Sequence, residues 1–408
     1  MMDKMNKAVF LLLSLLYFPL YGGVELGVDV FACGKYDQEL KGKRVGLISN
    51  HTGVNKNLLS TTTVLQSRGV QLVALFSPEH GWQGSSYAGE NTTDGKAAQL
   101  PIYSLHGKTR RPTDQMLKGI DVLIYDIQDI GVRSYTYATT LFYVMEEAAK
   151  RKIPVWVLDR PNPINGLIVD GGMLEKQWRS FIGYVNVPYC HGMTIGELAQ
   201  FFNGEYKVGC QLRVVPMKGW KRTMSFKETG LTWIPTSPHI PEADTPLFYA
   251  STGILGELEI VNIGVGYTLP FKVVGAPWID GELFAEKLNA QKLKGVRFVP
   301  FHYRPFYGSL KGKECQGVLI RVTDIRHYRP LSVQYLLMGI LKSLYPKQVQ
   351  GSLDQVKGNK KKLFCNANGN EEIYRLLLSE RYIAWKMIAY QQDEREQFQT
   401  HREKYLIY

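Results

Sequence analysis

The chain has 408 residues, of which 45% are hydrophobic and 21% are charged. This balance excludes an intrinsically disordered chain and predicts a globular protein with room for two or three domains. The formal net charge is +12, but the basic residues are spread along the sequence and form no basic helix or arm. The charge therefore favours a basic soluble protein, and binding to an anionic polymer such as nucleic acid or the cell wall is the alternative that it leaves open. Of these two polymers, we expect no nucleic-acid partner.

The first residues have the layout of a secretory signal. Lys4 and Lys7 precede a mostly apolar stretch over residues 8–20, and a glycine pair follows it. This stretch is too short to span a bilayer comfortably, so we predict a signal peptide over residues 1–23 and an exported protein, periplasmic or extracellular. An uncleaved anchor is the alternative. No later segment is apolar enough to predict a stable membrane span.

The first half of the chain alternates apolar runs with helical patterns. Because the runs are continuously apolar, they favour buried parallel strands that helices cover on both faces. The helix expected over 139–152 carries apolar residues on one face and ends in basic residues, which suit a helix C-terminus. Strands are predicted over 44–49, 71–76, 121–125 and 155–158, and a further helix over 58–68.

The second half has a mixed pattern, which predicts a second α/β domain. Turn-forming residues cluster at 162–166, so we place the boundary there and expect domains over 24–165 and 166–408. Helices are predicted over 196–203, 280–291, 331–344, 371–380 and 393–404, and strands over 212–216 and 317–323.

Polar residues follow each of the four strands predicted in the first half. The strands of an open parallel sheet point the same way, so the residues after them meet at one edge, where ligands bind. Polar residues also simply begin loops, but four polar ends together predict a site. The residues concerned are Asn50, His51, Glu79, His80, Asp126, Asp129, Asp159 and Arg160.

Several familiar site motifs are missing from the sequence. No glycine-rich dinucleotide loop follows the first strand, and there is no phosphate-binding loop, serine elbow or zinc-binding histidine pair. We therefore expect no cofactor and no metal. Carboxylates remain, and pairs of carboxylates cleave glycosidic bonds. Glu79 is the candidate general acid, because it follows a buried strand and Pro78, where apolar surroundings would raise its pKa. A helix-cap or loop carboxylate is its alternative role.

Seven short blocks carry a family resemblance that extends from about Gly42 to the C-terminus. The blocks lie at 42–54, 76–81, 125–137, 159–163, 191–199, 215–220 and 275–280. In this order they resemble the exo-β-N-acetylmuramidases of peptidoglycan recycling. One departure follows Glu257, where Ile260 and Val265 stand in place of the asparagine and arginine expected in that family.

The resemblance implies a Rossmann-like parallel-sheet domain followed by an auxiliary α/β domain, with the active site in the cleft between them. It implies a glycoside hydrolase that releases terminal N-acetylmuramic acid from the non-reducing end of peptidoglycan fragments, so muramyl saccharides are the expected partners. A non-catalytic peptidoglycan-binding protein on the same fold is the alternative, and it would not need an acid at Glu79. The candidate catalytic residues are Glu79 and Asp126, and the candidate substrate-binding residues are Asn50, His80, Asp129, Arg133, Tyr135, Asp159, Arg160, Asn162 and Glu257.

The chemistry of the sugar suggests roles for some of these residues. N-acetylmuramic acid carries a lactyl carboxylate, which suits a guanidinium fork such as Arg133 or Arg160. Alternatively, either arginine pairs with a nearby aspartate to hold the loops. The 2-acetamido group could attack the anomeric carbon, in which case Asp126 or Asp129 would orient it instead of acting as nucleophile, and both mechanisms stay open.

Overall fold

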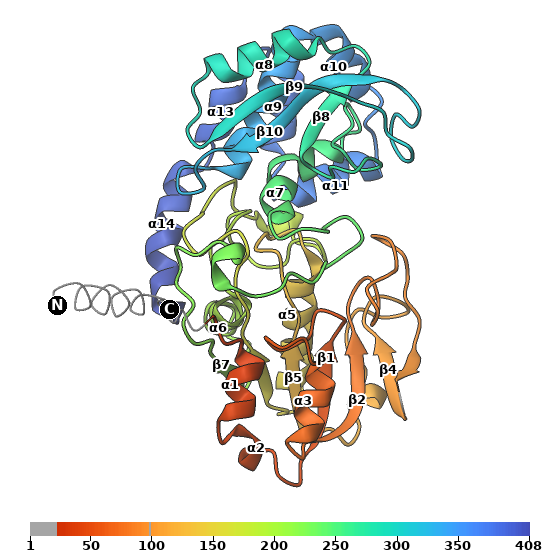
Figure 1. The fold of residues 1–408 in the computed structure, drawn as a ribbon, viewed down its shortest axis with the longest axis vertical. Coiled ribbons are helices and arrows are strands. Elements are labelled where there is room, and N and C mark those ends of the chain that lie inside the picture. Colours follow the sequence, from red (N-terminus) through yellow and green to blue (C-terminus); the bar gives the residue numbers. More distant parts are fainter. Residues whose placement is uncertain (1–22, 98) are drawn as a thin grey trace, which may run out of the picture.

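The computed structural model describes residues 23–97 and 99–408, so the predicted signal peptide, apart from Gly23, lies outside the described residues. The described chain forms two units stacked along the long axis of the molecule (Figure 1). The first is built on a seven-stranded sheet and the second on a three-stranded sheet. This confirms the predicted α/β class, with a parallel-sheet unit followed by a smaller α/β unit.

The seven-stranded sheet has the strand order β3-β4-β2-β1-β5-β6-β7. All its pairings are parallel except that of β3 with β4. The six parallel strands, numbered along the chain, therefore lie in the order 3-2-1-4-5-6, which is that of the Rossmann fold. The strands are β1 (Arg44–Ser49), β2 (Gln71–Ser77), β3 (Gly95–Ala97), β4 (Leu100–Ser104), β5 (Val122–Asp126), β6 (Val155–Leu158) and β7 (Leu212–Val215).

Helices bury both faces of this sheet, which is why its strands are apolar throughout. In β5, Val122 and Ile124 pack in one cluster with α1 and α3, whereas Leu123 and Tyr125 pack in another with α5 and α6. The helices of this unit are α1 (Gly27–Cys33), α2 (Tyr36–Glu39), α3 (Thr61–Ser67), α4 (Asp114–Leu117), α5 (Thr136–Lys150) and α6 (Ile195–Glu205), with 3-10 turns η1 (Lys176–Trp178) and η2 (Phe226–Thr229).

The second unit is an antiparallel sheet of order β8-β10-β9 with helices packed against it. Its strands are β8 (Val273–Ala276), β9 (Val296–Tyr303) and β10 (Cys315–Val322). Its helices are α7 (Thr245–Gly256), α8 (Gly281–Ala290), α9 (Pro330–Leu344), α10 (Pro346–Leu353), α11 (Asn359–Asn368), α12 (Glu372–Ser379), α13 (Ala384–Ala389) and α14 (Gln392–Arg402), followed by η3 (Glu403–Tyr405). The sequence did not predict β3, β4, β8, β9 or α7.

The first sheet continues beyond the boundary expected near residue 165. Strand β7 pairs in parallel with β6, with Val157 opposite Val214, and α6 packs against both strands. A Rossmann sheet needs this sixth parallel strand, so a boundary at 165 would cut through the sheet.

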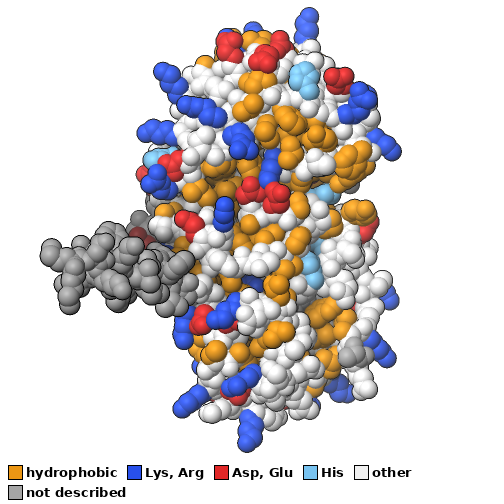
Figure 2. Space-filling view, viewed as in Figure 1, with side chains coloured by type: hydrophobic (Ala, Val, Ile, Leu, Met, Phe, Trp, Pro, Cys, Tyr) orange, Lys and Arg blue, Asp and Glu red, His pale blue; other side chains and the backbone are white. Residues whose placement is uncertain are grey.

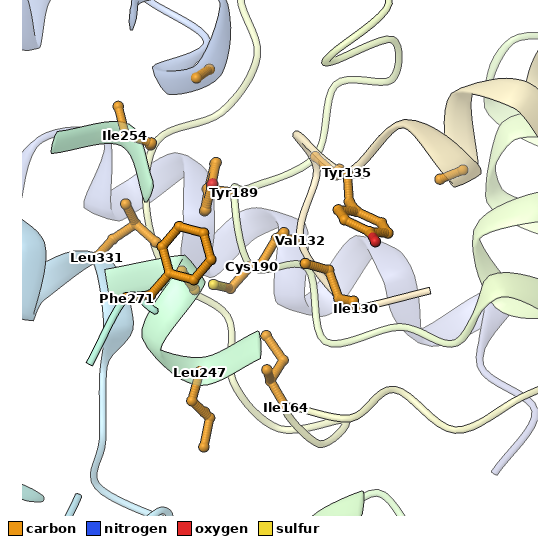
Figure 3. Packing of buried hydrophobic residues seen from close by; sticks show 14 of the residues in the cluster. Ile130, Val132, Tyr135, Ile164, Tyr189, Cys190, Leu247, Ile254, Phe271 and Leu331 are labelled. Carbon is orange, nitrogen blue, oxygen red and sulfur yellow. The ribbon is translucent and has the colours of Figure 1, made fainter. Parts of the chain in front are cut away.

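The two units share one hydrophobic core. It joins Ile130 and Val132, which follow β5, to Leu247 and Ile254 of α7 and to Leu331 of α9, and Figure 3 shows these side chains together. The junction is therefore packed like a protein interior.

On the face drawn in Figure 2, the Lys and Arg side chains are scattered and do not gather into one patch. No helix in the described part of the chain is long and apolar enough to cross a membrane.

Candidate active site

A cavity of about 550 Å³ lies between the two units, at the carboxyl edge of the seven-stranded sheet. The first unit contributes the loop after β2 and the beginning of α5. The second contributes one side of α7, the segment after it and part of α11. Among the residues that line the cavity are Glu79, His80, Gly89, Ser134, Tyr135, Thr136, His239, Tyr249, Gly253, Glu257, Glu259 and Val265.

Glu79 reaches this cavity because the chain turns sharply after β2. Pro78 ends the strand, and His80 and Gly81 adopt the left-handed conformation with φ of 70° and 77°. Both oxygens of the Glu79 carboxylate are held: Thr136 Oγ1 donates to Oε2 at 2.6 Å, and the Gly89 N–H donates to Oε1 at 2.7 Å. Glu79 is 8% exposed, so it is a buried carboxylate in a fixed orientation.

The pKa of Glu79 shifts in the direction opposite to that expected from the sequence. Burial is the largest single influence and would raise the pKa, but the hydrogen bonds from Thr136 and Gly89 and the charges of His106 and His80 together lower it below its ordinary value. His106 places Nε2 3.6 Å from Glu79 Oε1. Glu79 is therefore an ionised carboxylate at neutral pH.

Glu257 enters the same cavity from the second unit, where it directly follows the last residue of α7. Burial raises its pKa to about 7, and the neighbouring charge of Glu259 adds to the effect. The carbonyl groups at the C-terminal end of a helix also disfavour a negative charge there. The cavity thus brings together one carboxyl group that is held ionised and one whose pKa is raised to about 7.

His80 and Tyr135 also line the cavity, as the sequence analysis expected. His80 Nδ1 lies 2.7 Å from the Ser86 carbonyl oxygen, and the Tyr135 hydroxyl donates to Thr236 Oγ1 at 2.9 Å. The Tyr135 ring lies edge-on to Tyr249 of α7, with 6.3 Å between ring centroids. These contacts fix a polar and aromatic wall of the kind on which a sugar ring can pack.

Asp126, the expected second catalytic carboxylate, does not line the cavity. It is fully buried and forms an ion pair with Arg160, whose Nε and Nη2 lie 2.5 and 2.9 Å from its two oxygens. Thr61 donates a further hydrogen bond to it, and Arg160 Nη2 donates to the Val54 carbonyl. Arg160 therefore holds loops at the strand ends, as in the alternative role considered for it.

Arg133 is buried, and both terminal nitrogens of its guanidinium are bound within the protein. Its Nη1 and Nη2 donate to the backbone carbonyls of Gly172, Val187, Ala367 and Asn368, at 2.6 to 3.0 Å. No Lys or Arg is found among the described residues that line the cavity, and Val265 lines it where the family arginine is expected. Neither arginine lines the cavity, so the structure does not support the expected lactyl clamp.

The four remaining candidate residues form hydrogen bonds within the protein and do not line the cavity. Asn50 accepts from Thr52, and Asp129 accepts from the Gly131 N–H at 2.7 Å, while burial raises the pKa of Asp129 to about 7. Asp159, whose pKa burial and the charge of Glu197 also raise to about 7, accepts from Thr194, Gly196 and Tyr408. The Asn162 side chain accepts from the Ile164 N–H and donates to the Met193 carbonyl. None of these four side chains is among those that line the cavity.

Several residues of the site were not predicted from the sequence, among them Thr136, His106 and Tyr249. Thr136 lies inside a recognised block, so its hydroxyl could have been proposed as a partner of Glu79. His106 and Tyr249 reach the site only through the fold and carried no sequence signal. In the described part of the chain, no three His, Cys, Asp or Glu residues are grouped so that they could hold a metal ion.

Comparisons with known proteins agree with this geometry. The N-terminal and C-terminal models of the exo-β-N-acetylmuramidase NamZ family match residues 45–244 and 247–408. The chain is 41% identical, over 344 residues and 82% of each protein, to the peptidoglycan β-N-acetylmuramidase NamZ of Bacillus subtilis. A crystal structure of a DUF1343 family protein from Bacteroides fragilis superimposes with a TM-score of 0.88 at 42% identity, covering 94% of this chain and 99% of that one. A second such protein from B. fragilis gives a TM-score of 0.72 at 27% identity, with the same coverage. The chain therefore belongs to the NamZ family of exo-β-N-acetylmuramidases.

Proposed function

We propose that this protein is a glycoside hydrolase that removes terminal N-acetylmuramic acid from the non-reducing end of peptidoglycan fragments. The observation that carries the proposal is the position of Glu79, the glutamate of a family block, in the cavity between the two units that the family models match. The carboxyl group of Glu257 in the same cavity completes the pair that glycosidases use.

The cavity also suits one sugar residue with its substituents. Its volume of about 550 Å³ falls in the ordinary range for small-ligand pockets. Tyr135, Tyr249 and Phe271 offer apolar ring surface, and Ser134 and Ser237 offer hydroxyl groups. A single residue taken from a chain end is what an exo-acting enzyme has to bind.

The test is hydrolysis of a chromogenic β-N-acetylmuraminide by the purified protein, with the matching β-N-acetylglucosaminide as control. We expect release of the chromophore from the muraminide only, and release of N-acetylmuramic acid from the disaccharide N-acetylmuramyl-β-1,4-N-acetylglucosamine. Binding of the disaccharide without any hydrolysis would instead favour the non-catalytic wall-binding protein.

We also propose that the protein is exported. The basis is Lys4 and Lys7 followed by the apolar stretch over residues 8–20. Fractionation of native cells followed by N-terminal sequencing should find a chain that begins after Gly22 or Gly23, outside the cytosol. Recovery of a chain that still carries Met1 from the cytosol would contradict this proposal.

A further inference from the structure

The two carboxyl groups in the cavity have opposite surroundings. Glu79 accepts hydrogen bonds on both oxygens, from Thr136 Oγ1 at 2.6 Å and from the Gly89 N–H at 2.7 Å. His106 Nε2 lies 3.6 Å from the carboxylate, and among the described residues neither of the two buried ring nitrogens has a hydrogen-bond partner. Donors on both oxygens favour the ionised form, so this residue is poorly suited to hold a proton.

Glu257 has none of these supports. Within the described residues, no hydrogen-bond donor and no cation contacts its carboxyl group, which stands at the C-terminal end of α7 beside Glu259. Glu259 itself is exposed and pairs with Lys360 of α11. A helix C-terminus and a like charge both favour the neutral acid. The other titratable groups that line the cavity are Glu79, His80, Tyr135, Tyr189, His239 and Tyr249.

The position of α7 explains why the carboxyl groups of Glu79 and Glu257 line the same cavity. Tyr249, Gly253 and Glu257 follow one another at intervals of four residues, so they share the side of α7 that lines the cavity. The charges of both carboxyl groups act on the Tyr249 hydroxyl. Burial is the main cause that raises the pKa of Tyr249 and the hydrogen bond with Ser134 lowers it, while the charges of Glu257 and Glu79 each raise it further.

We propose that Glu257 donates the proton to the leaving glycosidic oxygen, and that Glu79 faces the anomeric carbon as its ionised partner. This inference rests on the proposed function. As the bond between C1 and the glycosidic oxygen breaks, its electron pair passes to that oxygen, which takes the Glu257 proton and leaves as a hydroxyl group. The carboxylate of Glu79 stabilises the positive charge that develops at C1. A water oxygen then bonds to C1, and a proton from that water restores the Glu257 carboxyl.

Leaving-group dependence separates the two roles. Glu257→Gln should lower turnover of the natural disaccharide by about 10²–10⁴-fold, because its leaving oxygen needs protonation. An aryl muraminide with a good leaving group needs little protonation, so the same variant should retain most of its rate. Glu79→Gln should lower turnover of both substrates together. The exchanged pattern, with the aryl substrate spared in Glu79→Gln only, would overturn the assignment.

The pH profile provides a second readout. For the natural disaccharide, kcat/KM should fall as the pH rises through the pKa of Glu257, because the acid must carry its proton. Glu259→Gln removes the adjacent negative charge, so this basic limb should move to lower pH. Glu286→Gln makes the same charge change on the exposed side of α8 and should leave the profile in place. A basic limb that persists in the residual activity of Glu257→Gln would contradict the proposal.

These outcomes stay separate from a failure of the proposed function. If the unmodified protein cleaves neither substrate, the proposed function is wrong. If the unmodified protein is active but Glu257→Gln cleaves the natural disaccharide at the normal rate, only the assignment of Glu257 is wrong. Thermal unfolding of each variant shows whether a loss of turnover comes from a loss of folded protein.

Discussion

Arg160 illustrates how a residue suited to substrate recognition is used to hold the fold. Its guanidinium forms a two-pronged pair with the buried Asp126 and also donates to the Val54 carbonyl. Lys carries the same charge but cannot reproduce this fork. We expect Arg160→Lys to lower the free energy of unfolding by roughly 2–4 kcal/mol, measured by urea denaturation.

The preference of that variant for muraminides over glucosaminides should stay unchanged, because Arg160 does not line the cavity. Arg304→Lys, at an exposed and weakly paired arginine, is the matched control. A fully stable Arg160→Lys protein that had lost its preference for muraminides would restore the clamp hypothesis.

At Glu257 we expect a pH-dependent gain of stability when the charge is removed. The folded-state pKa of about 7 lies above the ordinary value, so the fold favours the protonated form. As the pH rises from the unfolded-state pKa through 7, the unmodified protein loses stability, whereas a glutamine does not titrate. Relative to the unmodified protein, Glu257→Gln should therefore gain about 1–3 kcal/mol between pH 5 and pH 8.

Thermal unfolding at the two pH values checks this expectation. The gain should be small at pH 5, where both side chains are neutral, and full at pH 8. A difference between the two proteins that does not vary with pH would show that Glu257 ionises normally in the folded state.

At the scale of elements, α7 is the helix on which the site depends, and the sequence analysis did not predict it. Most of its residues are buried, including Ser251 and Thr252, so the helix lacks the one-sided apolar pattern that marks a surface helix. Gly253 lies in its interior and lines the cavity. For a Cβ added there, the nearest atoms would be those of the Tyr249 ring, at an ordinary contact distance of 3.5 Å.

We therefore expect Gly253→Ala to raise stability and weaken substrate binding at once. Alanine in a helix interior is favoured over glycine by roughly 0.5–1 kcal/mol. The new methyl group would also narrow the cavity, so KM for the muraminide should rise. Gly351→Ala in α10, where a Cβ meets no atom within 4 Å, should raise the melting temperature without changing KM. An unchanged KM in Gly253→Ala would show that substrate does not approach this side of α7.

At the scale of the whole molecule, the C-terminal segment connects the second unit back to the first. Helix α14 descends along the side of the molecule (Figure 1), and Arg402 at its end donates to the His191 and Gly192 carbonyls. The Tyr408 hydroxyl then donates to Asp159 Oδ2 at 2.8 Å and accepts from the Met217 N–H at 2.8 Å. The last residues of the chain thus complete the surroundings of β6 and β7.

Removal of the Tyr408 hydroxyl should lower the stability of the whole protein, although Tyr408 lies far along the sequence from the strands of the first sheet. We expect Tyr408→Phe to lower the free energy of unfolding by about 1–3 kcal/mol, because Asp159 and the Met217 N–H each lose a buried partner. Tyr382→Phe, at a tyrosine that is 74% exposed, should have no measurable effect in the same calorimetric scan. Equal melting temperatures for Tyr408→Phe and the unmodified protein would argue against this connection.

The sequence by itself determined the layered α/β architecture and the position of Glu79. Continuous apolar runs such as Val122–Asp126 can be buried on both faces only inside a parallel sheet, and such a sheet brings the ends of its strands to one edge. Pro78 and Gly81 mark the turn after β2, and the family blocks identify the glutamate between them. These features are local, so they can be read from the chain without the fold.

Only the tertiary structure decided which of the polar strand ends reach the substrate and in what state of charge. Asp126 and Arg160, which are 34 residues apart in the sequence, form an ion pair. Glu257 lines the same cavity as Glu79 because it follows α7, a helix that the hydrophobic pattern did not predict. The pKa of Glu79 is lowered because Thr136 and Gly89 donate to it. Burial raises the pKa of the half-buried Glu257, to which no residue in the described part of the chain donates a hydrogen bond. Hydrogen bonding and burial are set by contacts between distant segments, so residue type and spacing alone could not determine them.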